Sequence, residues 1–66
     1  MKVFINGETK EMEGGLNLRE LLGRFDLPSE RVAVELNKQV VRRKDWESTE
    51  IKDADKIEIV HFVGGG

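Results

Sequence analysis

A single apolar stripe constrains the fold of this chain more than any other feature of its sequence. Leu18, Leu21, Leu22 and Phe25 recur at the spacing i, i+3, i+4 and i+7, which places them on one face of an amphipathic helix. A helix with one apolar stripe can cover only one face of a partner. We therefore expect it to pack on one face of a sheet that the rest of the chain supplies.

The two ends of this helix are also marked in the sequence. Asn17 is a suitable N-cap, and Glu20 stands three residues later, as in a capping box. Leu16, before the cap, is placed to pack on Leu21 as a hydrophobic staple. Pro28 is expected to end the helix, because the residue before a proline is pushed out of the α region.

Short runs of β-forming residues surround the helix. Asn6-Gly7 predicts a type I′ hairpin, and Asn37-Lys38 predicts a second turn. The polar strand that returns from the first hairpin is expected to lie at a sheet edge. The predicted strands cover residues 3–5, 8–12, 32–36, 39–41 and 56–62. Residues 42–50 are predicted to form a loop or one helical turn around Trp46, a core or edge plug. The fold class is therefore α+β.

Length and composition narrow the possible functions. Sixty-six residues allow one domain with a small core. The chain has no cysteine, which removes disulfides, a thiol nucleophile and thiolate metal sites, and the lone His61 cannot build a metal site. A net charge of −2 argues against nucleic-acid binding. No apolar run is long enough for a membrane span or a signal peptide, so we expect a cytoplasmic protein without a metal or catalytic residues of its own.

The ordered set of elements resembles a known family. The residues that carry the likeness are Asn6-Gly7, Leu18 to Leu22, Val32-Ala33-Val34 with Asn37, Val40-Val41-Arg42, Trp46, and the closing strand that runs into Gly65-Gly66. Together they are similar to the ThiS sulfur-carrier family of ubiquitin-like β-grasp proteins. The resemblance implies a mixed sheet of four to five strands with the helix on one face. It also implies a single domain over residues 1–66, with residues 63–66 as a flexible glycine tail in which Gly64 is a spacer.

The same resemblance implies a function for the tail. The carboxylate of Gly66 would be adenylated by a separate ThiF-like adenylating enzyme that uses ATP and magnesium. A persulfide or sulfide, supplied by a donor such as a cysteine desulfurase, would then displace AMP and leave a thiocarboxylate. A ThiG-like thiazole synthase would accept the sulfur during thiamine biosynthesis. The chain would be a co-substrate and not an enzyme, would bind no cofactor, and would be a monomer on its own.

Glycine suits such a tail for physical reasons. Without a Cβ it passes through a narrow channel and leaves the carbonyl carbon of Gly66 unhindered. From Phe62 to Gly66 an extended tail spans about 15 Å. That length lets the carboxylate reach a buried active site while the folded body stays outside.

The body would then serve as a recognition surface. Alternation along the first and last strands turns Phe4, Val60 and Phe62 away from the helix. With Val63 beside the tail, these residues are predicted to form an apolar patch that docks a partner enzyme, unless the loop around Trp46 covers it. Charged residues would orient the partner rather than add much affinity. They are Arg42, Arg43, Asp53 and Asp55, which a solvated loop and a turn also explain.

Other functions stay open at this point. The small subunit of molybdopterin synthase is a sibling sulfur carrier with the same fold and a Gly-Gly end. A ubiquitin-like protein modifier or a plain binding module would also share the fold, which alone does not decide function. The terminal glycines by themselves are typical of any disordered end. His61 is interpreted as a strand residue without a chemical role, although its place beside the tail allows a partner contact.

Overall fold

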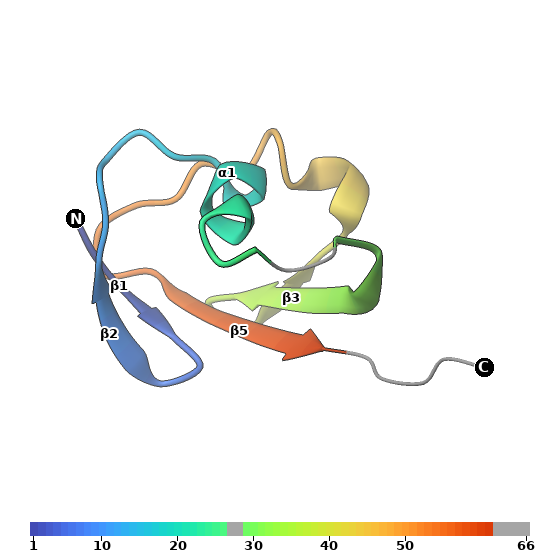
Figure 1. Cartoon of the computed structure of the whole chain (residues 1–66), viewed down its shortest axis with the longest axis horizontal. Helices are drawn as coiled ribbons and strands as arrows, with labels where there is room; N and C mark the ends of the chain where they lie inside the picture. The colour runs from blue at the N-terminus through green and yellow to red at the C-terminus, as the bar shows by residue number, and fades with distance from the viewer. Residues whose placement is uncertain (27–28, 62–66) are drawn as a thin grey trace.

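The computed structural model describes residues 1–26 and 29–61 as one mixed five-stranded sheet with a short helix on one face (Figure 1). The strands lie in the order β2-β1-β5-β3-β4. The elements are β1 Lys2–Ile5, β2 Glu8–Glu11, α1 Leu18–Gly23, the 3₁₀ turn η1 Ser29–Arg31, β3 Val32–Leu36, β4 Gln39–Val41, η2 Arg43–Asp45 and β5 Lys56–His61. The predicted α+β class and the strand order along the sequence are confirmed.

Strand β5 occupies the middle of the sheet. It pairs in parallel with β1, where Phe4 lies opposite Lys56 and Ile5 opposite Ile57. It pairs antiparallel with β3 from Val32 opposite His61 to Leu36 opposite Ile57. The polar β2 lies at one edge, as expected, and β4 lies at the other edge. The last strand of the chain is thus held from both sides.

Both predicted hairpin turns are present with the backbone that their residues favour. Asn6 and Gly7 have φ values of 49° and 82°, and Asn37 and Lys38 have φ values of 51° and 72°. Two successive residues with positive φ are the mark of a type I′ turn, which suits the twist of antiparallel strands. The register of β1 with β2 and of β3 with β4 therefore follows from these two turns.

Helix α1 begins where the sequence predicts but ends earlier. Asn17 accepts a hydrogen bond from the Glu20 N–H at 2.8 Å, and Glu20 Oε1 accepts one from the Asn17 N–H at 3.0 Å, which completes the capping box. The regular helix ends at Gly23, and Pro28 lies outside the described residues. After the helix, hydrogen bonds from each N–H to the carbonyl three residues earlier continue as far as Asp26, whose φ is 57°. The weak helix propensity of glycine explains the early end, and Phe25 packs on the core from the turn that follows.

The core lies between α1 and the sheet, and it is closed at one side by the segment before β5. Trp46 is only 2% exposed and donates its indole N–H to the Val41 carbonyl oxygen at 2.9 Å, so it is a core residue. Leu16 is buried with Leu21, in agreement with the predicted staple. The buried apolar residues are Val3, Ile5, Leu16, Leu18, Leu21, Leu22, Val32, Val34, Trp46, Ile51 and Ile57.

One ion pair ties the turn before the helix to the end of the helix. Arg24 Nη2 lies 3.0 Å from Glu13 Oε2, and both side chains are exposed. The hydrogen bond from Arg24, followed by its charge, lowers the pKa of Glu13. Because the pKa is lower in the folded state, the small stabilisation from this pair is present at neutral pH. It is lost as the pH falls through the lowered pKa.

Removing core volume under the helix should cost a large part of the stability. Leu21 has no exposed surface, so Leu21→Ala should lower the free energy of unfolding by about 2–5 kcal/mol. A domain of this size has about 3–10 kcal/mol in total. Arg19→Ala, on the exposed side of the same helix, should stay within about 0.5 kcal/mol of the parent chain. Urea denaturation followed by circular dichroism measures both, and equal losses would show that the helix does not cover this core.

Candidate functional site

The candidate site is the described end of β5, which directly precedes residues 62–66. His61 is the last described residue of this strand and lies opposite Val32 on β3. The predicted tail and its neighbours, Phe62, Val63, Gly64, Gly65 and Gly66, lie outside the described residues. The geometry of the site is therefore that of the strand end and of the surfaces around it.

The face of the sheet opposite α1 carries the first of these surfaces (Figure 1). Val60 is 58% exposed there, while Phe4 is half-buried on the same face. Phe4 lies opposite Lys56, whereas Val60 lies opposite Ala33 on the other side of β5. Four residues along β5 separate the two positions, which is about 13 Å. Of the two, only Val60 lies near the described end of β5, and the prediction that Phe4 and Val60 share one patch with Phe62 and Val63 stays a prediction.

A residue that the sequence analysis did not assign to this face also lies on it. Val40 on β4 is 70% exposed, the largest exposure among the bulky apolar residues described. It lies opposite Glu35 on β3, which makes it a diagonal neighbour of Ala33 and thus places it toward Val60. Alternation along β4 could have indicated this exposure. Val41, the next residue in the strand, faces the core, so Val40 faces outward.

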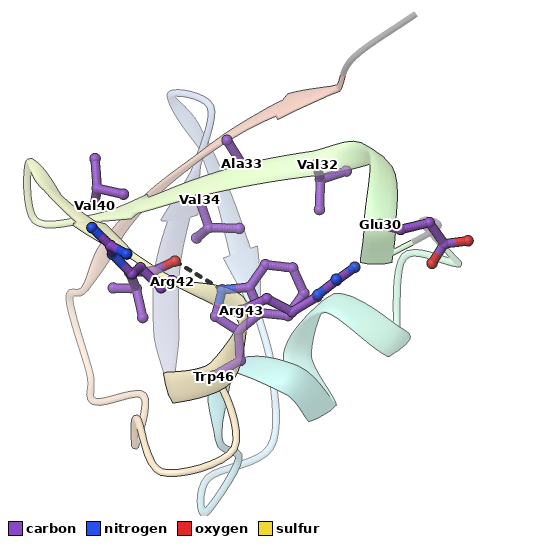
Figure 2. Close-up of a pocket in the computed structure, with 9 residues that line it drawn as sticks. Glu30, Val32, Ala33, Val34, Val40, Arg42, Arg43 and Trp46 are labelled. Atoms are coloured by element: carbon purple, nitrogen blue, oxygen red, sulfur yellow. Dashed lines mark hydrogen bonds between the residues drawn. The ribbon is translucent and has the colours of Figure 1, made fainter. Parts of the chain in front are cut away.

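A hollow lies beside this surface, at the edge of β3 where β4 stops (Figure 2). The buried indole of Trp46 lies at its base, and the dashed line in Figure 2 is its hydrogen bond to the Val41 carbonyl. Arg42 points toward the Val40 side of the hollow and Arg43 toward the Glu30 side. The lining residues are Glu30, Val32, Ala33, Val34, Val40, Val41, Arg42, Arg43 and Trp46. The two arginines that were predicted to orient a partner thus lie at the sheet edge that β4 forms.

A second hollow lies on the other side of β5, near the strand end. Ile5, Phe25 and Ile59 supply its apolar part, and Asn6, Glu8, Lys10 and His61 complete the lining. His61 is exposed at this position. Its interpretation as a strand residue is confirmed, and its contact with a partner stays a prediction.

The two aspartates predicted to orient a partner do not lie near the strand end. Asp53 Oδ1 accepts a hydrogen bond from the Lys2 N–H at 2.8 Å, at the start of β1. Asp55 accepts hydrogen bonds from the Lys52 N–H at 2.8 Å and from Asn37 Nδ2 at 3.0 Å. Both carboxylates thus hold the turn before β5, at the opposite end of the strand from the tail. The alternative reading as turn residues is confirmed.

Two asparagines bind β5 directly. Asn6 Oδ1 accepts a hydrogen bond from the Ile59 N–H at 2.7 Å, and Asn6 Nδ2 donates to the Ile59 carbonyl oxygen at 3.2 Å. At the start of the strand, Asn37 Oδ1 accepts from the Lys56 N–H at 3.0 Å. The sequence analysis assigned both residues to turns only. No local pattern indicates the second role, because it depends on the pairing of segments far apart in the sequence.

Within residues 1–26 and 29–61, no group of three or more His, Asp or Glu side chains is placed to hold a metal ion. The described part of the chain also has no helix long and apolar enough to cross a membrane. The features that remain are a strand end, an exposed apolar surface and two hollows beside it.

The order of elements, the mixed sheet and the single helix across it define a ubiquitin-like β-grasp domain. A crystal structure of the thiamine biosynthesis protein ThiS from Geobacter metallireducens has the same fold, with a TM-score of 0.86, 38% identity and full coverage of both chains. The family model described as "ThiS family" matches residues 3–66, and the chain belongs to this family.

Three further relatives include one carrier of similar length and two longer proteins. The sulfur carrier protein ThiS of Bacillus subtilis is 43% identical over 49 residues, which are 74% of each chain. The thiazole synthase of Magnetococcus marinus is 44% identical over 66 residues, which are 100% of this chain but 20% of that protein. A thiazole synthase of Paramagnetospirillum magneticum has the same coverage. The chain therefore spans about a fifth of the length of these two synthases.

Proposed function

We propose that this chain is a sulfur carrier for thiazole formation in thiamine biosynthesis, with the Gly66 carboxylate as its working group. The membership in the ThiS family, over residues 3–66, is the observation that carries the proposal. The central position of β5 supports it, because the strand that precedes the tail is held from both sides. The family match favours this function over the molybdopterin-synthase, modifier and binding-module alternatives.

The proposed chemistry begins with a poor electrophile. The Gly66 carboxylate is ionised at neutral pH and resists attack by nucleophiles. In the proposed reaction it attacks the α-phosphate of ATP and releases pyrophosphate, which leaves an acyl-adenylate. Hydrosulfide then attacks the acyl carbon, AMP leaves, and a thiocarboxylate remains. Both steps take place in a partner adenylating enzyme with ATP and magnesium, so the carrier is a co-substrate and binds no cofactor of its own.

The thiazole synthases support the identity of the sulfur acceptor. In two of them a stretch similar to this whole chain makes up a fifth of a longer protein. A carrier-like segment joined to a synthase is at a high effective concentration for its partner, which favours a functional association. We therefore propose a thiazole synthase as the acceptor for this carrier. The sulfur donor, a single domain with a flexible tail, a monomeric state and a cytoplasmic location stay predictions from the sequence.

We also propose a docking surface beside the strand end. Val60, Ala33 and Val40 form an exposed apolar surface on β5, β3 and β4, called here the open-face surface. It is continuous with the strand that leads to Phe62 and Val63, which we keep as proposed contacts. Phe4 is half-buried and set apart by the register, so its contact with a partner stays a prediction.

The direct test of the carrier function is intact-mass spectrometry. The purified chain, incubated with ATP, magnesium, sulfide and a ThiF-like adenylating enzyme, should gain the mass of one sulfur in exchange for one oxygen. Deletion of Gly66 shortens the tail and removes the carboxylate from the active site, so this variant should gain nothing. Equal modification of both chains would place the chemistry elsewhere. No modification of either chain, with enzyme binding intact, would favour a binding module.

A second prediction tests the glycine requirement. Gly66→Val adds a branched side chain next to the reacting carbonyl, so adenylation should be lost while the thermal unfolding midpoint stays unchanged. Release of pyrophosphate measures adenylation, and circular dichroism measures folding. Adenylation of the variant at the parental rate would contradict the narrow-channel argument.

A third prediction tests the open-face surface. Val60→Asp places a charge in the apolar contact nearest the tail, so the carrier concentration at half-maximal adenylation should rise by about tenfold, equivalent to about 1.4 kcal/mol. Val40→Asp is the matched control, since it is at least as exposed but lies two strands away, and a smaller rise is expected. A larger effect at Val40 than at Val60 would move the docking surface to β4.

A further inference from the structure

We propose that Asn6 is a positioning residue for the end of β5: its side-chain amide holds the strand at Ile59, shortly before residues 62–66. This inference rests on the proposed function, in which the tail is the substrate of a partner enzyme. The residue lies in the first hairpin, 53 positions before the backbone group that it binds.

The pairing of β1 with β5 shows what the Asn6 side chain replaces. In this parallel ladder the Phe4 N–H donates to the Asp55 carbonyl and the Asn6 N–H donates to the Ile57 carbonyl, each at 2.9 Å. A regular continuation would have the Ile59 N–H donate to the backbone carbonyl of Asn6. The Ile59 N–H donates instead to Asn6 Oδ1 at 2.7 Å.

The second bond completes the substitution. Asn6 Nδ2 donates to the Ile59 carbonyl oxygen at 3.2 Å, where the N–H of a longer β1 would lie. A carboxamide carries an acceptor oxygen and donor hydrogens in one plane, as a peptide group does. The backbone of Asn6 has meanwhile entered the turn with φ 49°, so its own carbonyl is no longer directed along the strand. One side chain thus continues the ladder after the backbone has left it.

Asn37 makes the acceptor half of this substitution at the other end of β5, while its Nδ2 donates to Asp55 Oδ1. Its N–H donates to the Lys56 carbonyl at 2.7 Å, and its Oδ1 accepts from the Lys56 N–H at 3.0 Å. It also opens a type I′ turn, with φ 51°. The two asparagines therefore hold opposite ends of one strand through their side-chain amides, but only Asn6 lies at the end that leads to the tail.

The position of Asn6 along β5 decides its effect on the tail. Beyond Ile59, the described residues Val60 and His61 lie opposite Ala33 and Val32 of β3. Among residues 1–26 and 29–61, the bonds of Asn6 are the last that β5 receives from the β1 side. Without them the strand end is held by β3 alone. The strand end from Ile59 to His61 then samples more orientations, and only a fraction of the molecules presents it in the orientation that the enzyme binds.

The test compares two glycine variants. Asn6→Gly keeps the positive φ of the turn, because glycine adopts it freely, and removes both side-chain bonds. Asn37→Gly makes the same change at the far end of β5 and carries the same entropic cost in the unfolded chain. We measure amide hydrogen exchange at Ile59 by NMR, and the carrier concentration at half-maximal adenylation.

Asn6→Gly should speed exchange of the Ile59 amide and raise the half-saturating carrier concentration, each by about tenfold, on the scale of two net hydrogen bonds. The maximal rate should not change, since the reacting groups are intact. Asn37→Gly should leave half-saturation at the parental value even if it lowers global stability equally, and it should speed Ile59 exchange by no more than that loss of global stability explains. Equal effects of the two variants on half-saturation would overturn the positioning role.

A conservative variant separates positioning from direct contact with the enzyme. Asn6→Asp keeps the acceptor for the Ile59 N–H and loses the donor, so it should protect the Ile59 amide better than Asn6→Gly. Across the parent chain, Asn6→Gly and Asn6→Asp, the half-saturating carrier concentration should rise with the exchange rate of the Ile59 amide. A rise in half-saturation without faster exchange at Ile59 would assign Asn6 to the enzyme contact and overturn the inference. If the parent chain is not adenylated at all, the proposed function fails, while the exchange data still decide whether Asn6 holds the strand.

Discussion

The parallel pairing of β1 with β5 is the constraint on which the rest of this structure depends. It joins the first and the last strands of the described chain, so every other element has to be placed between them in sequence and around them in space. Parallel neighbours need a crossover connection. Here the crossover includes α1, and the helix can shield the core only if its apolar stripe faces the sheet (Figure 1). The same pairing puts the strand that precedes the tail at the centre of the sheet.

This arrangement separates stability from chemistry. The helix and the Trp46 segment cover one face of the sheet, and the buried residues on that side supply the hydrophobic stabilisation of a very small domain. The opposite face keeps Val40 and Val60 exposed and is free for a partner. No buried polar cluster is needed, because the proposed reaction takes place in another protein. A carrier of this kind needs a rigid body, a recognisable face and a fixed point from which its tail begins.

The sequence was informative where local chemistry decides the outcome and uninformative where distant segments meet. The bounds of β3, the capping box at Asn17 and both type I′ turns could be predicted, because each depends on neighbouring residues. The helix end was placed too late, since Pro28 was weighed above Gly23. The separation of Phe4 from Val60 depends on the register of β1 with β5, which alternation alone does not give. Strand faces therefore follow from alternation, whereas neighbours across strands depend on a register that the sequence does not show.

The bonds of Asn6 show how one residue satisfies two demands that conflict. A type I′ turn requires the backbone to leave β1 at Asn6, whereas the end of β5 still has an N–H and a carbonyl at Ile59 directed toward β1. Two more residues in β1 would satisfy these groups, but they would carry the hairpin about 6–7 Å further along β5. The hairpin would then extend alongside His61, which lines the second hollow. A side-chain amide ends the ladder without adding backbone, so the strand end is held while this side of His61 stays open to an enzyme.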